Sequence, residues 1–299
     1  MDQAAADSLS PDFSVLYDAT LVDKEDELLK EIVDADAIIV RNRTQVRGEL
    51  LEKAKQLKAV GRLGVGLDNI DMDACKERGI EVFPATGAND AAVAEYVITT
   101  TMMLLRRAYL AFDAMANGEW PRTQLMGNEI AGKTLGLVGF GAIARETAAK
   151  AKVLGMNTVA YDPFLNEDNP AWKGTTKMDL DDVLKSSDAI SLHVPLTDGT
   201  KHIINKDSIK LMKPECVLIN AARGGVVDDI ALIAALKKNQ IAGAALDVYE
   251  AEPLTAEFGV EMKGLKNLIL TPHIGGVTIE SNVRVSAVTA ENVRRALEE

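Results

Sequence analysis

The chain has 299 residues, of which 47% are hydrophobic, so it can form one large or two medium-sized domains with buried cores. Its formal net charge of −12 argues against nucleic acids and anionic membrane surfaces as partners, but leaves room for a small anionic substrate. Cys75 and Cys216 lie far apart without metal-ligand spacing, which predicts reduced thiols in a cytoplasmic protein and no metal site. No apolar run reaches the roughly 18 residues that a membrane span needs.

Short apolar segments alternate with helical patterns along residues 1–89, which predicts a parallel α/β domain. A helix is expected at 24–33, and strands are expected at 14–17, 37–40, 59–62 and 81–83. The chain opens on a helix-like segment at 2–8, where such a domain would normally begin with a strand. We therefore expect the natural start to lie upstream.

A long apolar helix is predicted from Asp90 to Met115. It carries more apolar surface than one domain can cover, so we expect a homodimer that forms through residues 91–115. Six strands are then expected, at 134–138, 158–161, 189–193, 216–220, 243–248 and 268–271. Six strands with intervening helices are the number found in a dinucleotide-binding (Rossmann) domain.

The last predicted helix, 280–297, is short, and we expect it to return to the first domain. The predicted organisation is therefore two domains, each a parallel sheet flanked by helices. A flavodoxin-like substrate domain comprises 1–89 and 273–299, and a Rossmann domain comprises 90–272. In such proteins ligands bind at the carboxyl ends of the strands, so the active site is expected between the domains.

A glycine-rich turn joins the strand 134–138 to the start of a helix. Gly139 allows a tight turn, Gly141 lets the backbone approach phosphates, and Ala144 is small enough for close helix packing. The N-terminal amides of the new helix favour a pyrophosphate. Asp162 ends the next strand, where a carboxylate accepts hydrogen bonds from a ribose and repels a 2′-phosphate. The pattern therefore predicts NAD rather than NADP.

Oxidation of a hydroxyl group by such a cofactor needs a general acid/base, for which the chain offers His193, His202 and His273. His193 and His273 both follow strands, and position alone does not choose between them. Arg223 also follows a strand and could hold a 2-oxo carboxylate through two hydrogen bonds. Glu252 could fix the tautomer of a neighbouring imidazole.

The chain resembles the D-isomer-specific 2-hydroxyacid dehydrogenases over essentially its whole length. The segments that carry the resemblance are 61–71, the Gly139 turn, 192–197, 212–228, 247–253 and 272–276. The resemblance implies hydride transfer between NAD and a D-configured 2-hydroxy acid. Arg223 would bind the carboxylate and polarise the carbonyl, His273 would be the acid/base, and Glu252 would be its partner.

The resemblance also implies the residues that contact each ligand. Asp247 would face the nicotinamide carboxamide, and His193 would serve a positional role in the cofactor domain. The cofactor contacts implied are Gly139, Gly141, Ala142, Ile143, Asp162, His193, Pro195, Thr200, Ala221, Ala222, Asp247, Gly275 and Gly276. Backbone amides of Leu63, Gly64 and Val65 would bind the substrate carboxylate.

The segment Arg41-Asn42-Arg43 follows a strand of the first domain and is expected on the substrate side. An additional cation there favours a substrate with a second anionic group. Segments 18–23, 41–44, 61–71, 118–122 and 125–127 are similar to a subgroup, the (S)-sulfolactate dehydrogenases, which interconvert 3-sulfolactate and 3-sulfopyruvate. Arg41 is the first choice for the sulfonate, with Asn42 beside it and Arg43 and Arg122 as alternatives.

Other functions stay open at this point. A 3-phosphoglycerate dehydrogenase or a glyoxylate/hydroxypyruvate reductase would use the same catalytic set. An NAD-sensing binding protein without catalysis would not need the complete set of Arg223, Glu252 and His273. A formate dehydrogenase of this fold would carry Gln at the position of Glu252, so Glu252 argues against that activity.

Overall fold

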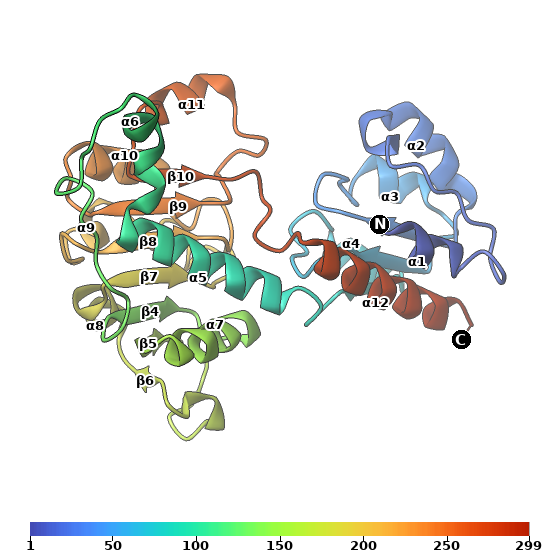
Figure 1. The fold of residues 1–299 in the computed structure, drawn as a ribbon. Helices are drawn as coiled ribbons and strands as arrows, with labels where there is room; N and C mark the ends of the chain where they lie inside the picture. Colours follow the sequence, from blue (N-terminus) through green and yellow to red (C-terminus); the bar gives the residue numbers. More distant parts are fainter. Residues whose placement is uncertain (299) are drawn as a thin grey trace. The chain divides into compact units, whose positions relative to one another are not determined.

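The computed structural model describes residues 1–298, which form two compact units (Figure 1). Unit 1 comprises Met1–Asn89 and the segment that starts at Gly276. Unit 2 comprises Asp90–Gly275. The second division lies slightly beyond residue 272, so His273 packs with unit 2. Both units are parallel sheets flanked by helices, which confirms the predicted α/β class.

Within residues 1–298, the sheet of unit 1 has three parallel strands in the order β1-β2-β3. The strands are β1 (Ala37–Val40), β2 (Ala59–Arg62) and β3 (Glu81–Pro84). One face is covered by α2 (Glu25–Glu31) with the 3-10 turn Ile32–Asp34, α3 (Glu49–Lys53) and α4 (Met72–Glu77). Two helices from the ends of the chain pack together on the sheet, α1 (Gln3–Asp7) and α12 (Ile279–Glu298).

The predicted strand at 14–17 is wrong, because this segment is irregular. Its side chains do not enter a core: Leu16 is 61% exposed, and Val15 and Tyr17 are also exposed. A strand needs a hydrogen-bonded neighbour and at least one buried face, and this segment has neither in the described part of the chain. Tyr17 instead donates its hydroxyl to the carbonyl of Met1, at 2.7 Å.

The sheet of unit 2 has seven parallel strands within the described residues, in the order β10-β9-β8-β7-β4-β5-β6. Its first strand therefore lies inside the sheet, and the strand order reverses between β4 and β7, as in a doubly wound dinucleotide-binding fold. The strands are β4 (Thr134–Val138), β5 (Asn157–Tyr161), β6 (Thr176–Lys177), β7 (Ala189–Leu192), β8 (Val217–Asn220), β9 (Gly243–Leu246) and β10 (Leu268–Leu270). The six predicted strands are present, and β6 is an additional edge strand.

Helices cover both faces of this sheet (Figure 1). Strand side chains alternate between the two cores, so Val217 and Ile219 of β8 face one core while Leu218 faces the other. The first core is closed by α5 (Asp90–Arg106) and α7 (Ala142–Val153). The second is closed by α8 (Leu180–Ser186), α9 (Lys206–Ile209), α10 (Asp229–Lys237) and α11 (Ala256–Met262).

The predicted helix from Asp90 to Met115 is wrong in its last part, because α5 ends at Arg106. Arg107 takes a left-handed backbone conformation with φ +56°. The chain returns across the helix end, and the amide of Asn128 donates to the carbonyl of Leu105 at 2.8 Å. That carbonyl would otherwise accept the bond that continues the helix, so the returning segment takes over part of the helix cap.

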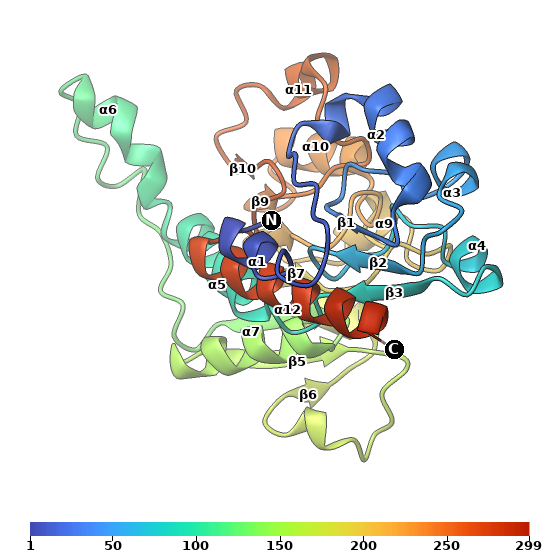
Figure 2. The same cartoon turned by 90° about the vertical axis from the view of Figure 1, so that its right-hand side faces the viewer.

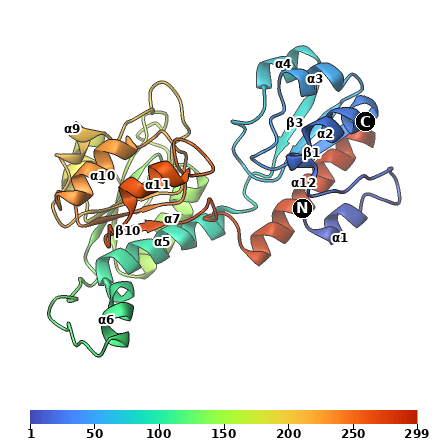
Figure 3. The same ribbon diagram turned by 90° about the horizontal axis from the view of Figure 1, so that it is seen from above.

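After α5, the chain forms a short arm, which we define as residues 108–126. It contains the 3-10 turn Ala108–Ala111 and α6 (Phe112–Ala116), and it projects from the rest of unit 2 (Figures 2 and 3). Several of its large apolar side chains are exposed, including Phe112 at 78% and Trp120 at 74%. Among the described residues, no helix is long and apolar enough to cross a membrane.

Candidate active site

The candidate site residues of unit 2 follow the carboxyl ends of six strands in one parallel sheet. Because the strands are parallel, these ends lie along the same edge. The residues that follow β4, β5, β7, β8, β9 and β10 in turn are Gly139, Asp162, His193, Arg223, Glu252 and His273.

The glycine-rich turn has the geometry that a dinucleotide needs. Gly139 has φ +89°, and a Cβ at this position would come within 2.7 Å of the His193 carbonyl, so no side chain fits. Gly141 caps α7, and a Cβ there would meet no atom within 4 Å, so its backbone is open to approach. Ala144 is fully buried, as close helix packing requires. Ala142 and Ile143 form the first turn of α7.

Asp162 lies directly against this turn. Its Oδ2 accepts a hydrogen bond from the amide of Phe140 at 2.8 Å, and its Oδ1 accepts one from the amide of Phe164 at 2.9 Å. A carboxylate is therefore fixed beside the open backbone of Gly141 and the N-terminus of α7. These residues fit a dinucleotide with a ribose at Asp162 and phosphates at the turn.

His193 is a partly buried histidine that directly follows β7. Its Nε2 lies 3.0 Å from the hydroxyl of Ser191, and burial lowers the pKa of the imidazole to about 4. It is therefore neutral near pH 7. The turn that follows is closed by Thr200, whose hydroxyl donates to the carbonyl of Pro195 at 2.6 Å. The structure thus brings together the predicted cofactor contacts Pro195 and Thr200.

Glu252 and His273 form a close pair. Nδ1 of His273 lies 2.7 Å from Oε2 of Glu252, and Oε1 of Glu252 accepts a hydrogen bond from the amide of Tyr249 at 3.2 Å. Burial alone would raise the pKa of Glu252, but the hydrogen bond and charge of His273, the Tyr249 amide and the charge of Arg223 together lower it. Glu252 therefore stays a carboxylate at neutral pH and fixes the orientation of the His273 ring.

Arg223 is brought to this pair by a backbone contact. A Cβ on Gly224 would lie 1.7 Å from the carbonyl oxygen of Tyr249, so the loop after β8 touches the loop that carries Glu252. The Arg223 loop is itself fixed by Asn220, which is almost completely buried. The Asn220 side chain donates to the carbonyl of Arg223 at 3.0 Å and accepts from the amide of Ala222 at 3.1 Å. The structure therefore brings Arg223, Glu252 and His273 together.

Asp247 organises the turn on which His273 lies. It is 1% exposed and accepts hydrogen bonds from the hydroxyl of Thr271 at 2.6 Å and from the amides of Ile274 at 2.8 Å and Gly275 at 2.6 Å. Tyr96 from α5 extends this network, with its hydroxyl 2.6 Å from Thr271. Burial raises the pKa of Tyr96 to about 12, so the phenol stays protonated. Gly275 also packs on Ala221, another predicted cofactor contact.

The predicted substrate residues lie in unit 1, and so does Gly276. Their loop uses two of its own amides: Leu63 donates to the carbonyl of Val40 at 2.9 Å, and Gly64 donates to that of Arg62 at 2.8 Å. Val65 is partly exposed. The amide role predicted for Leu63 and Gly64 would therefore need these bonds to be exchanged.

The two arginines of the segment 41–43 have different partners. The Arg41 guanidinium donates to the side-chain oxygen of Asn282, which is a neutral amide. The Arg43 guanidinium forms an ion pair with Asp23. Asn42 between them is exposed. A new anion would therefore compete with a carboxylate at Arg43 but with a neutral group at Arg41.

Sequence reasoning missed two features near the predicted residues. Arg62 is only 9% exposed, and its guanidinium lies beneath the 63–65 loop, where it donates to the carbonyl of Leu63 at 2.6 Å. An arginine that ends a strand immediately before a glycine-rich loop is a signal that could have indicated this. The second feature is a pair between His202 and Glu250, at 2.6 Å. His202 and Glu250 are distant in sequence, so no local pattern indicates their contact.

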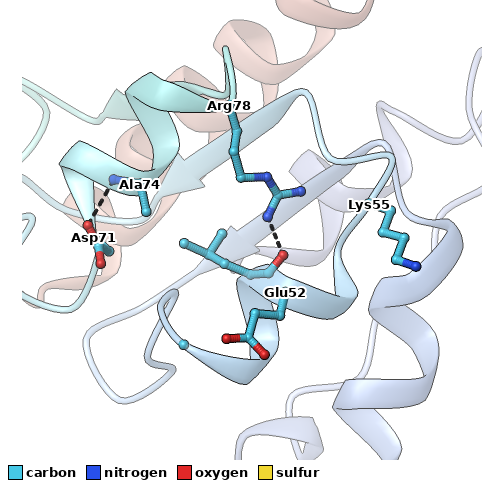
Figure 4. Close-up of a pocket in the computed structure, with 7 residues that line it drawn as sticks. Glu52, Lys55, Asp71, Ala74 and Arg78 are labelled. Carbon is cyan, nitrogen blue, oxygen red and sulfur yellow. Dashed lines mark hydrogen bonds between the residues drawn. The ribbon is translucent and has the colours of Figure 1, made fainter.

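A surface hollow in unit 1 lies between α3 and α4 (Figure 4). Arg78 reaches across it and donates to the carbonyls of Leu51 and Ala54, and Asp71 accepts from the amide of Ala74. The bonds of Arg78 join α4 to α3, and the bond of Asp71 caps the start of α4, so all of them serve the fold. None of the predicted site residues lines this hollow.

Comparison with known proteins identifies relatives over nearly the whole chain. A family profile described as "D-isomer specific 2-hydroxyacid dehydrogenase, NAD binding domain" matches residues 98–275, more than half of the chain. An (S)-sulfolactate dehydrogenase from Chromohalobacter salexigens is 54% identical over 298 residues, which cover 99% of this chain and 96% of that protein. A hydroxypyruvate reductase from Thermotoga maritima is 42% identical, over 92% of this chain and 89% of its own.

The fold is similar to that of solved structures in the same group. The crystal structure of D-lactate dehydrogenase from Aquifex aeolicus, complexed with NAD and lactic acid, superposes with a TM-score of 0.83. Its sequence is 33% identical, and the match covers 90% of this chain and 85% of that one. The similarity therefore extends through both units.

Proposed function

Because the chain belongs to the family of D-isomer specific 2-hydroxyacid dehydrogenases and uses NAD, we propose that it interconverts (S)-3-sulfolactate and 3-sulfopyruvate. The observation that carries this substrate assignment is the 54% identity with an (S)-sulfolactate dehydrogenase over 99% of the chain. The different partners of Arg41 and Arg43 support it, because an anion at Arg41 would displace the neutral amide of Asn282, whereas one at Arg43 would displace the carboxylate of Asp23.

In this proposal, His273 is the acid/base for the oxygen on C2. Glu252 holds the ring through Nδ1, so Nε2 is the atom that gives or takes the proton. Arg223 binds the carboxylate of the substrate and polarises the carbonyl, a task suited to its planar pair of donors. NAD supplies or accepts the hydride when it is bound, and the residues around Gly141 and Asp162 hold it.

Recognition of the group on C3 is assigned to unit 1. We propose that Arg41 binds the sulfonate, with Asn42 beside it. The 63–65 loop then holds the substrate carboxylate, with the buried charge of Arg62 beneath it. A phosphate would satisfy the same cation, which makes 3-phosphohydroxypyruvate the natural competitor. Hydroxypyruvate and glyoxylate lack a second anion and would not use Arg41.

A substrate panel tests this assignment directly. NADH oxidation with 3-sulfopyruvate, 3-phosphohydroxypyruvate, hydroxypyruvate, glyoxylate and pyruvate should give the highest kcat/KM with 3-sulfopyruvate. A higher value with hydroxypyruvate or with the phosphorylated compound would replace the proposed substrate. No turnover with any of the five would remove the proposed activity altogether.

A variant pair tests the role of Arg41. Arg41→Ala should raise KM for 3-sulfopyruvate at least about tenfold, since a hydrogen bond to a charged group contributes about 1.5–3 kcal/mol. It should leave KM for glyoxylate nearly unchanged. Arg43→Ala is the matched control, because that side chain is paired with Asp23. Equal effects of Arg41→Ala on both substrates would refute the second-anion site.

We propose further that the protein forms a homodimer through α5 and the arm that follows it. Most of α5 is buried within unit 2, but the arm exposes Phe112, Met115, Trp120 and Met126. A soluble monomer rarely exposes this many large apolar side chains on one projecting segment. We also propose a cytoplasmic location, because Cys75 and Cys216 are buried free thiols.

A further inference from the structure

The loop after β9 carries two glutamates two positions apart, and each is paired with a histidine. Glu252 bonds His273, at 2.7 Å, and Glu250 bonds Nε2 of His202, at 2.6 Å. His202 comes from the loop after β7 and takes a left-handed backbone conformation, with φ +51°. Its amide donates to the carbonyl of Gly225 at 2.8 Å, so it also contacts the loop after β8.

Asp229 contacts the same loop through the backbone of Glu250. It lies in the first turn of α10, is 3% exposed, and accepts a hydrogen bond from the amide of Glu250 at 3.4 Å. Burial raises the pKa of Asp229 to about 6; the charges of Glu250 and Asp228 add to this, while the Glu250 amide and His202 oppose it. A carboxylate at this position therefore weakens the fold at neutral pH.

We propose that His202, Glu250 and Asp229 form a loop clamp: they are positioning residues that fix the backbone of 249–252, from which Glu252 holds His273. The inference rests on the proposed dehydrogenase function, because the clamp acts only through the His273–Glu252 pair. It adds a role for His202, which lies between His193 and His273 in the sequence.

The geometry explains how the clamp acts on the reaction. The amide of Tyr249 bonds Glu252, and the carbonyl of Tyr249 packs on Gly224 next to Arg223. The next residue, Glu250, is held by His202 through its side chain and by Asp229 through its amide. Release of Glu250 would therefore free the backbone that sets the distance between Glu252 and the His273 ring.

The clamp lies away from the part of the predicted cofactor site that would hold the ribose and the phosphates. The glycine-rich turn and Asp162 follow β4 and β5, whereas the clamp joins loops and a helix that follow β7, β8 and β9. Loss of the clamp should therefore lower kcat strongly and change the affinity for NADH little, although the predicted contacts Pro195 and Thr200 share the loop after β7 with His202. A residue that only stabilised unit 2 would change kcat and the affinity for NADH together, or would leave the two unchanged.

Alanine and conservative variants at two clamp positions provide the test. Glu250→Ala and His202→Ala should each lower kcat about tenfold, a fraction of the 10²–10⁴ attributed to general acid/base catalysis. Glu250→Gln and His202→Gln keep a hydrogen bond between these positions and should recover most of that loss. The affinity for NADH, measured by quenching of tryptophan fluorescence, should stay within about twofold of the wild type. Glu261→Ala is the matched control, because Glu261 is an exposed partner of Lys237 in the same unit.

Hydrogen exchange gives a readout that does not depend on turnover. In Glu250→Ala, amide exchange in peptides that cover 248–252 should accelerate about tenfold or more, while Glu261→Ala should show wild-type exchange. Unchanged exchange in Glu250→Ala, or unchanged kcat, would overturn the clamp. If the wild type reduces no 2-oxo acid in the panel, the proposed function fails, and accelerated exchange would then show only that the clamp holds the loop.

Discussion

His273 has a left-handed backbone conformation, and its ring is held by Glu252. Its φ is +57°, and its amide donates to the carbonyl of Asp247 at 2.9 Å. Side chains other than glycine take this left-handed conformation at some cost, with Asn among the most tolerant. His and Asn are both among the non-glycine residues that take this conformation most readily, so Asn can replace His273 with the backbone unchanged.

Replacing His273 by Asn therefore removes the imidazole while retaining the backbone. If His273 is the acid/base, His273→Asn should lower kcat by at least about two orders of magnitude. NADH affinity and the thermal unfolding midpoint should stay close to wild type, which steady-state kinetics, fluorescence titration and calorimetry would establish. A variant that keeps normal turnover would exclude His273 from proton transfer.

Asp162 offers a residue-scale test of cofactor choice. Its carboxylate is fixed beside the glycine-rich turn and would repel a 2′-phosphate. Asp162→Ala should weaken NAD and improve NADP, so the ratio of kcat/KM for the two cofactors should fall about tenfold or more. Asp168→Ala, an exposed aspartate on the same segment, is the control. An unchanged ratio in Asp162→Ala would refute the assigned ribose contact.

At the scale of elements, the sequence predicted the strands of three or more residues but not the two-residue strand β6. Residues 37–40, 59–62 and 134–138 were predicted with the observed bounds, because each is a short segment with apolar residues that lies between helical patterns. The edge strand β6 has only two residues and shows no periodicity. The end of α5 was missed because a distant segment, at Asn128, determines it.

The candidate site divides in the same way. Arg223, Glu252 and His273 were found because each follows a strand and carries recognisable chemistry. Their spatial proximity depends on the neighbouring positions of β8, β9 and β10, which the chain order alone does not establish. His202 and Glu250 lie 48 positions apart, so their pairing becomes visible only once these loops are placed.

The first turn of α10 yields a prediction about pH. The pKa of Asp229 rises from 3.8 to about 6 on folding, mainly through burial, so the folded state holds the proton more tightly. The associated stabilisation is complete below about pH 4 and is lost as the pH rises through about 6. A shift of this size corresponds to at most about 3 kcal/mol.

Asp229→Asn does not titrate and should therefore gain stability relative to the wild type as the pH rises. Urea unfolding should show this relative gain to be about 1–3 kcal/mol between pH 4 and pH 8. Asp198→Asn, at an exposed aspartate, should show no such trend. A stability difference that does not depend on pH would show that Asp229 is not the group that titrates.

For the whole molecule, the proposed dimer depends on the arm after α5. Light scattering should give twice the mass of one chain. Trp120→Glu, which places a charge on a side chain that is 74% exposed, should lower that mass towards one chain at micromolar concentration. Ile230→Glu, an exposed apolar position on α10, which covers the other face of the sheet from α5, should remain dimeric. A monomeric wild type would contradict the proposal.

The contact between Gly224 and the carbonyl of Tyr249 has a consequence for how this protein can be altered. With only 1.7 Å available to a methyl group, even alanine would push two loops apart. In a library that randomises position 224 alone, selection for turnover should recover glycine almost without exception. Engineers who wish to change which acids are accepted should therefore leave this junction intact and diversify unit 1 instead.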